Sequence, residues 1–409
     1  MKMCATSSIC RCWEDIDFKL AEKNVKKLQR RIADAHHNGK PKVVSVLQHK
    51  LTHSFYAKAL AIKIVTTRKG KYTPGVDGIV WATSRDKFNA IFELNRREYK
   101  PEPLRRIYIS KSGGKKRPLS IPTMRDRAMQ MLYKFALDPI AEDAADKNSY
   151  GFRIGRGAKD AVLKCIKELS DPYNAFVLKA DIKSCFDNIS HEWLLQNIPM
   201  DKFILRRILK CGYISNNIYH PTTKGIPQGG CLSTTVCNLT LDGLEELIKK
   251  NAKSSVSYIR FADDIIVIGA WGFELTNTVK PLINDFLLQR GLRLSPEKTK
   301  FSLVNDGFTF LGCEIKRNYK TVEVLPTQKN IDSLNKRVDE IIDEYKMDST
   351  TCFEKLIRVI GGWCSYYKDI VPDSVLYKWV EVSSKLPFFG ASHGLCGNVK
   401  IILKSNKRR

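Results

Sequence analysis

Three aspartates occupy positions where carboxylates could hold metal ions. Asp181 closely follows an apolar segment, 175–178, that is typical of a buried strand. Asp263 and Asp264 are adjacent, between two apolar runs that predict a β-hairpin over 257–268. Two neighbouring acids in an apolar hairpin repel each other unless a cation lies between them. Turn formation alone would explain one of these aspartates but not both, so we expect metal ligands.

Carboxylates of this kind suit phosphoryl transfer. That reaction requires a protein mainly to position its substrates and to neutralise charge. Two Mg²⁺ ions about 3.5–4 Å apart can clamp the attacking and leaving oxygens. Mg²⁺ prefers carboxylate oxygens and needs few of them, because water and substrate phosphates complete its shell. The sequence therefore predicts a site for two Mg²⁺ ions.

The charge balance predicts a polyanionic partner. The 409 residues include 69 Lys and Arg against 43 Asp and Glu, a formal net charge of +26. Such an excess favours nucleic acid, although a solvated basic surface is the alternative. A predicted amphipathic helix over 13–37 concentrates this charge on its polar faces. We expect four of its side chains to contact RNA, with a solvated face as the alternative: Lys23, Lys27, Arg30 and Arg31.

Turn-forming residues and the spacing of apolar residues predict the remaining helices and strands. We expect a helix over 41–66, a strand over 105–111 and a return strand after a hairpin tip. Residues 123–170 should be helical, and a further helical region should lead to the glycine loop at 225–230. A strand near 308–311 should precede a composition shift at 325–327, after which apolar spacing predicts a new helix.

Several other classes of protein are excluded by the sequence. The 12 cysteines lack the paired spacing of a zinc site, and no apolar run reaches the roughly 18 residues that span a membrane. The N-terminus has no signal-peptide core. His49 and His53 have the spacing of a zinc helix, but Lys50 replaces the glutamate that such a site needs. We expect a soluble, cytoplasmic protein.

The segment Phe261-Ala262-Asp263-Asp264 resembles the [YF]-x-D-D box of reverse transcriptases, and its neighbours follow in the order typical of that family. Residues 181–187 resemble the first metal-binding motif, and 225–230 the loop that contacts nucleotide and template. Residues 291–299 and 310–312 resemble the two later palm motifs. Group II intron-encoded reverse transcriptases are the most similar subfamily, through the N-terminal extension (13–78), fingers (111–127 and 148–156) and thumb (362–367).

This resemblance implies an α+β fold, a right-hand polymerase with fingers, a palm whose antiparallel sheet packs on helices, and a helical thumb. The expected boundaries are 1–100 for the N-terminal extension and start of the fingers, 101–170 for the fingers, 171–324 for the palm, 325–385 for the thumb and 386–409 for a basic tail. The implied activity is RNA-directed DNA polymerisation, in which deoxynucleoside triphosphates extend a primer on a structured RNA template and yield cDNA. Mn²⁺ should be able to substitute for Mg²⁺.

The resemblance also assigns roles to single residues. Asp181 and Asp263 would be direct metal ligands, Asp264 would complete the site, and the backbone carbonyl of Ile182 would add a ligand. Phe186 would exclude a 2′-hydroxyl, with ordinary core packing as the alternative. The residues implied to bind nucleotide are Lys111, Arg117, Phe186, Gln228 and Gly229, and those of the primer grip are Phe310, Leu311 and Gly312.

More than one biological role is consistent with the sequence. The chain ends soon after the thumb motif, whereas many intron-encoded enzymes continue into a DNA-binding segment and a nuclease. We therefore expect antiviral defence in bacteria with a dedicated noncoding RNA, and keep group II intron splicing and retromobility, with intron RNA as the template, as the alternative. A maturase with a vestigial polymerase is less favoured, because all three aspartates are present.

Overall fold

The computed structural model describes residues 10–110, 116–319, 321–345, 348–372 and 375–376. The chain forms two compact units. The first comprises residues up to 147, 181–247 and 282–296, and the second comprises 148–180, 248–281 and the chain from 297 onward. Both units combine helices with sheets, so the fold class is α+β, as predicted. Within the described residues, none of the helices has the length and apolarity that a membrane span requires.

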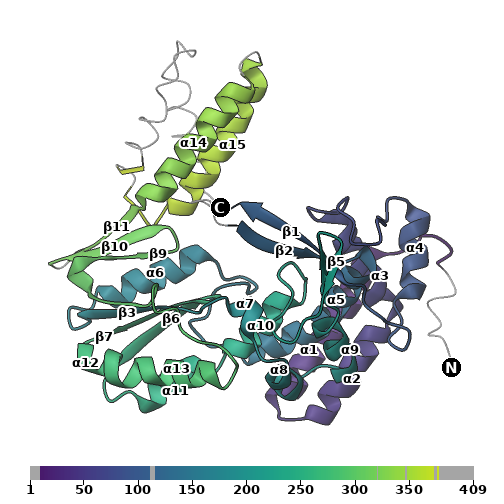
Figure 1. Ribbon diagram of the computed structural model, residues 1–409, viewed down its shortest axis with the longest axis horizontal. Coiled ribbons are helices and arrows are strands. Elements are labelled where there is room, and N and C mark those ends of the chain that lie inside the picture. The colour runs from purple at the N-terminus through teal and green to yellow at the C-terminus, as the bar shows by residue number, and fades with distance from the viewer. Residues whose placement is uncertain (1–9, 111–115, 320, 346–347, 373–374, 377–409) are drawn as a thin grey trace. The chain divides into compact units, whose positions relative to one another are not determined.

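The first unit is mostly helical (Figure 1). The sheet formed by its described residues has the strand order β2-β1-β4-β5, in which β1 and β4 are parallel and the other pairs antiparallel. The strands are β1 (Leu104–Ser110), β2 (Lys116–Ile121), β4 (Tyr213–Ser215) and β5 (Ile218–His220). The helices are α1 (Phe18–His37), α2 (Pro41–His53), α3 (Phe55–Thr67), α4 (Ser84–Glu93), α5 (Met124–Asp143), α7 (Cys185–Asn188), α8 (His191–Asn197), α9 (Lys202–Leu209) and α10 (Ser233–Leu241).

Helix α1 is amphipathic, as predicted, but begins at Phe18 rather than near residue 13. Asp17 caps it by accepting a hydrogen bond from the backbone N–H of Leu20. Its apolar stripe is buried in the first unit. The single helix expected over 41–66 is instead two helices, because Ser54 has extended backbone angles and separates α2 from α3. Serine is a favoured residue at helix N-termini, and Ser54 has the extended backbone of such a position, although its side chain makes no capping hydrogen bond. The continuous apolar periodicity concealed this boundary.

The described residues of the second unit form two sheets and include a pair of long helices. One sheet has the order β6-β7-β3-β8 and the other β11-β10-β9. The strands are β3 (Phe176–Asp181, of which only Asp181 belongs to the first unit), β6 (Val256–Phe261), β7 (Asp264–Gly269), β8 (Lys300–Leu303), β9 (Phe308–Phe310), β10 (Cys313–Asn318) and β11 (Thr321–Pro326). The helices are α6 (Ala158–Leu169), α12 (Gly272–Glu274), α14 (Gln328–Glu344) and α15 (Ser349–Tyr367). Helices α11 (Leu244–Asn251) and α13 (Lys280–Leu288) cross from one unit to the other.

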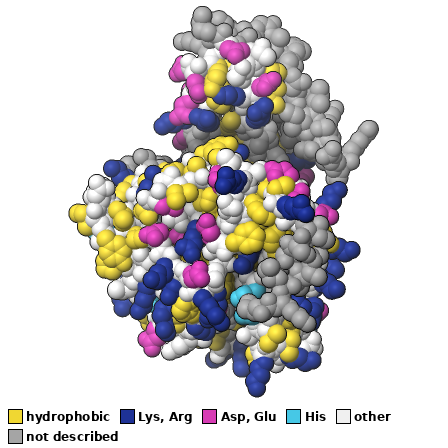
Figure 2. All heavy atoms as spheres, turned by 90° about the vertical axis from the view of Figure 1, so that its right-hand side faces the viewer, with side chains coloured by type: hydrophobic (Ala, Val, Ile, Leu, Met, Phe, Trp, Pro, Cys, Tyr) yellow, Lys and Arg dark blue, Asp and Glu magenta, His cyan; other side chains and the backbone are white. Residues whose placement is uncertain are grey.

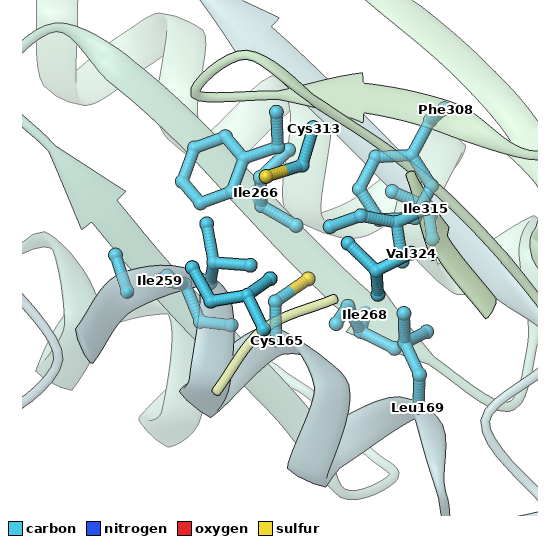
Figure 3. Packing of buried hydrophobic residues seen from close by; sticks show 14 of the residues in the cluster. Cys165, Leu169, Ile259, Ile266, Ile268, Phe308, Cys313, Ile315 and Val324 are labelled. Carbon is cyan, nitrogen blue, oxygen red and sulfur yellow. The ribbon is translucent and has the colours of Figure 1, made fainter. Parts of the chain in front are cut away.

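The core of the second unit lies between α6 and its sheets. Figure 3 shows Cys165 and Leu169 of α6 facing apolar side chains of β6, β7, β9, β10 and β11. All four residues of β7 from Ile265 to Ile268 are fully buried. A strand buried on both faces is rich in Ile and Val, because neither face meets water. The strand that begins with Asp264 is therefore firmly anchored.

Three further stretches differ from the sequence expectations. Residues 123–170 are not one helical region, because α5 ends at Asp143 and α6 begins at Ala158. A hairpin, β4–β5, lies within the region expected to be helical before the glycine loop. Its turn residues, Asn216 and Asn217, both have positive φ (51° and 62°), a conformation that asparagine tolerates well. The hairpin β10–β11 was also not expected, whereas α14 buries its predicted residues, Ile331, Leu334, Val338 and Ile341.

Candidate active site

Asp181 is the last residue of β3 and is 9% exposed. The backbone after it is held by the segment at 293–295. The carbonyl of Asp181 accepts a hydrogen bond from Ser295 N (2.7 Å), and Lys183 N donates to the carbonyl of Arg293 (2.9 Å). Ile182 forms an isolated antiparallel bridge with Leu294. The later palm-like motif at 291–299 therefore fixes the chain at the first acid.

Asp263 and Asp264 lie at a tight hairpin turn in the second unit. The predicted hairpin is present, but its turn is shorter than expected. Phe261 pairs with Asp264, so only Ala262 and Asp263 form the turn between β6 and β7, and Asp264 is the first residue of β7 rather than part of the turn. Ala262 has a positive φ of 56°, which short hairpin turns need and which alanine adopts at a cost in backbone strain. The buried Arg260 donates from Nη1 to the carbonyl of Ala262 (3.3 Å) and so supports the turn from within the protein.

A second support for this turn comes from residues 148–151. Backbone hydrogen bonds join Arg260 N to Asn148 O (2.9 Å) and Tyr150 N to Arg260 O (2.8 Å), so this segment runs beside β6. A Cβ on Gly151 would lie well under 3.0 Å from the backbone nitrogen of Ala262. Sequence reasoning assigned this segment to the fingers by resemblance and missed its contact with the turn. The available signal was Gly151 itself, since glycine permits close backbone approach.

The sheet order makes β7 the neighbour of β3 in the second unit. Asp264, the first residue of β7, and Asp181, the last residue of β3, therefore belong to adjacent strands, and Asp263 immediately precedes β7. Carboxylate oxygens are suitable ligands for Mg²⁺. Within the described ranges, no three His, Cys, Asp or Glu side chains already lie together as a formed metal site.

The residues expected to bind nucleotide form a connected group in the first unit. The side chain of Gln228 donates from Nε2 to Asp187 Oδ1 (3.0 Å) and accepts from Arg117 Nε (3.3 Å). Its backbone carbonyl accepts from Ser120 N (2.8 Å), which joins the glycine loop to β2. The structure thus brings together Arg117 and Gln228, whereas Lys111 lies outside the described residues.

The loop at 225–230 also packs tightly against the segment after Asp181. Ile226 N donates to the carbonyl of Phe186 (2.6 Å), and the Phe186 ring is half-buried. Gly229 has a φ of 115°, and a Cβ there would clash with the carbonyl of Ser120. Both conditions exclude a larger side chain at Gly229.

Phe310, Leu311 and Gly312 lie at the β9–β10 connection in the second unit. Phe310 pairs with Cys313, so Leu311 and Gly312 form a two-residue turn with φ values of 47° and 80°. The Phe310 ring is buried in the core, and the turn residues are half-buried. Only the turn is therefore placed to meet a ligand.

The four basic residues singled out on α1 are all exposed. They line a shallow concavity together with Lys19, Glu22 and Lys26, so one carboxylate accompanies six cations. Lys and Arg side chains are also spread over the face of the molecule that Figure 2 shows. The helix therefore presents a basic surface, as predicted.

The sequence matches known families over most of its described length. The family model described as reverse transcriptase (RNA-dependent DNA polymerase) matches residues 109–315, and the model for the N-terminal domain of reverse transcriptase matches residues 13–94. The chain therefore belongs to the reverse transcriptase family, a class of RNA-directed DNA polymerases. Its helices and antiparallel strand pairs agree with the right-hand polymerase fold expected for this family.

Curated relatives point to the group II intron-like branch. Protein YkfC of Escherichia coli is 29% identical over 322 residues, which cover 66% of this chain and 84% of that protein. The group II intron-encoded protein LtrA of Lactococcus lactis is 37% identical over 199 residues, 46% of this chain but only 33% of LtrA. Maturase-like protein 1 of Euglena gracilis is 26% identical over 372 residues, 85% of this chain and 76% of that protein. The chain is thus a group II intron-like reverse transcriptase.

Proposed function

We propose that Asp181, Asp263 and Asp264 form the polymerase centre and hold two Mg²⁺ ions. The observation that carries this proposal is the strand order, because β3 ends with Asp181 and its neighbour β7 begins with Asp264, directly after Asp263. Asp181 and Asp263 would ligate directly, with Asp264 and the carbonyl of Ile182 completing the site. The ions, when bound, would activate the primer 3′-hydroxyl and neutralise the triphosphate.

The remaining residues would orient the substrates. Arg117 and Lys111 would hold the triphosphate, since guanidinium and ammonium groups both pair with phosphate oxygens. Gln228 and Gly229 would lie along the nucleotide, and the Phe186 ring would exclude a 2′-hydroxyl. The turn at Leu311 and Gly312, with Phe310 as its buried anchor, would support the end of the primer.

The proposed subdivision follows the sequence boundaries. Residues 1–100 would form the N-terminal extension and start of the fingers, 101–170 the fingers, 171–324 the palm and 325–385 the thumb. The proposed tail at 386–409 lies outside the described residues.

The test of the polymerase centre is the double variant Asp263→Asn/Asp264→Asn on a primed RNA template. Each change keeps the size of the side chain and removes its charge. We expect no deoxynucleotide incorporation with Mg²⁺ or Mn²⁺, while RNA binding stays near the wild-type level. Asp306→Asn is the matched control, because Asp306 is an exposed acid of the same unit. Polymerisation by the double variant would disprove this assignment.

For the template, we propose one particular structured RNA. The names of the relatives, an intron-encoded protein and a maturase-like protein, favour intron RNA, with a role in splicing and retromobility. Antiviral defence with a dedicated noncoding RNA remains our second candidate, although none of these names supports it. Both roles predict that the α1 surface contacts the RNA.

Sequencing the RNA that copurifies with the protein from its host separates these roles. Intron RNA among the bound species supports the first role, and one short RNA encoded beside the gene supports the second. Reads scattered over all transcripts would refute a dedicated partner and leave the polymerase proposal unaffected.

A further inference from the structure

The turn at Leu311 and Gly312 is held by side chains from the helices α14 and α15. Tyr366 donates its hydroxyl to the carbonyl of Leu311 (2.7 Å), and Tyr367 donates its hydroxyl to the carbonyl of Gly312 (2.8 Å). Asn330 Nδ2 also contacts the carbonyl of Gly312 (3.3 Å). Both carbonyls of a two-residue turn are thus occupied by donors from one helix pair.

Tyr367 also contacts the other two donors. Asn330 Nδ2 donates to the Tyr367 hydroxyl at 2.8 Å, and the two tyrosine rings meet edge to face with centroids 4.8 Å apart. The backbone N–H of Thr327, just before α14, adds a hydrogen bond to the carbonyl of Gly312 (3.0 Å). We call Asn330, Tyr366 and Tyr367 the brace.

The brace fits closely around the turn. A Cβ on Gly312 would overlap Asn330 Nδ2, so the amide occupies the space that any larger residue would need. The Tyr367 ring is 1% exposed within the apolar core, whereas its hydroxyl reaches the polar turn. Burial raises the pKa of both tyrosines, so each hydroxyl remains a donor at neutral pH.

Core packing would account for the tyrosine rings but not for their hydroxyls. A phenylalanine at either position would fill the same apolar volume, and buried polar groups are retained where they have partners. Four donors converge on two adjacent carbonyls whose residues have positive φ. Such a contact fixes the backbone conformation of the turn and joins it to the helix pair, so movement of the helices would carry the turn with it.

We infer that Asn330, Tyr366 and Tyr367 are positioning residues that set the 311–312 turn and thereby hold the primer strand at its 3′ end. This inference rests on the proposed role of the turn as the primer grip. It predicts that the helix pair governs how long the primer stays bound, separately from nucleotide binding.

The experiment uses the full chain with the double variant Tyr366→Phe/Tyr367→Phe, which removes both hydroxyls and keeps both rings. The probe is a fluorescein-labelled DNA primer annealed to an RNA template, with binding followed by anisotropy. We expect about a fivefold to tenfold weaker primer–template binding, as the loss of two hydrogen bonds suggests. With a heparin trap, products should become shorter, while the KM for deoxynucleotide stays within about twofold.

The matched control is Tyr345→Phe. The Tyr345 hydroxyl donates to Glu344 Oε1 (2.7 Å) at the other end of α14, away from the turn. The Tyr345→Phe variant should bind and extend the primer like the wild type. Asn330→Ala is a second brace variant, and thermal unfolding confirms that each variant is folded. A general structural role would lower the unfolding temperature and change all kinetic constants together.

Two results would overturn the inference: wild-type binding and product lengths in folded brace variants, or equal losses in Tyr345→Phe. The binding assay needs no synthesis, so it tests the brace even if the wild-type chain makes no DNA. Absence of synthesis by the wild type would instead refute the proposed function.

Discussion

The side-chain amide of Gln228 bridges Asp187 and Arg117, donating to the carboxylate at 3.0 Å and accepting from the guanidinium at 3.3 Å. A carboxylate only accepts hydrogen bonds, so Asp187 requires the Nε2 group of the amide to face it. The amide oxygen is then left to face Arg117. Asp187 thus orients Gln228, although it lies 41 residues away in the sequence.

Asp187→Asn should weaken nucleotide binding, because the amide of Gln228 is no longer held in one orientation. We expect the KM for deoxynucleotide to rise about threefold, the loss of one modest hydrogen bond. Steady-state incorporation at varied nucleotide concentration measures this. In a Gln228→Ala background the substitution should have no further effect, and additive losses in this double-mutant cycle would show that Asp187 acts elsewhere.

Arg117→Ala should raise the nucleotide KM and lower kcat, because a triphosphate contact strengthens in the transition state. A charge-assisted hydrogen bond contributes about 1.5–3 kcal/mol, so kcat/KM should fall by about 10- to 100-fold. Arg117 is exposed on β2, and the fold should survive. Lys116→Ala, at the exposed neighbouring position, is the control with a small expected effect. An unfolded Arg117→Ala protein would indicate a structural role.

Phe186→Val should relax the discrimination against ribonucleotides. A smaller side chain leaves space for a 2′-hydroxyl, and the ratio of kcat/KM for deoxy- over ribonucleotide should fall about tenfold or more. Parallel incorporation assays with both nucleotides give this ratio. If the half-buried ring only packs in the core, the variant will unfold at a lower temperature with its sugar selectivity unchanged.

Gly151→Ala should displace the turn that carries Asp263, because the new Cβ would overlap the backbone of Ala262. Small misplacements of catalytic groups are costly, and we expect kcat to fall about tenfold or more with primer binding preserved. Single-turnover incorporation at varied primer–template concentration measures the rate of the chemical step separately from primer binding. Gly362→Ala is the control, because a Cβ there meets nothing within 4 Å. Normal kcat in Gly151→Ala would show that the turn tolerates this displacement.

Reversing the charge of the α1 surface should weaken RNA binding in a salt-dependent way. The variant replaces Lys23, Lys27, Arg30 and Arg31 with glutamate. Affinity falls as salt rises, and each lost phosphate contact makes the slope of log affinity against log salt less steep by about 0.7–0.9. Filter binding from low to high salt measures the slope. Lys249→Glu/Lys250→Glu, at exposed positions of α11, is the control. An unchanged slope would mean that this face of α1 is only solvated.

Local patterns in the sequence determined several elements. The alternation of apolar residues on either side of the acid pair predicted the β6–β7 hairpin, and helical spacing predicted α1 and α14. These patterns suffice because each element buries one face or forms one tight turn, and the information lies within a few neighbouring residues. Asp181, Asp263 and Asp264 stood out for the same reason, since charge beside apolar runs is visible locally.

Only the tertiary structure decided how distant segments support these elements. The pairing of residues 148–151 with β6, the bridge from Asp187 through Gln228 to Arg117, and the tyrosine hydroxyls at Leu311 and Gly312 all join residues far apart in the chain. Hydrogen bonds of this kind cannot be predicted from the periodicity of the sequence, because the residues around a tyrosine or glutamine are the same whether or not its side chain finds a distant partner. Their partners are determined by how the chain packs as a whole.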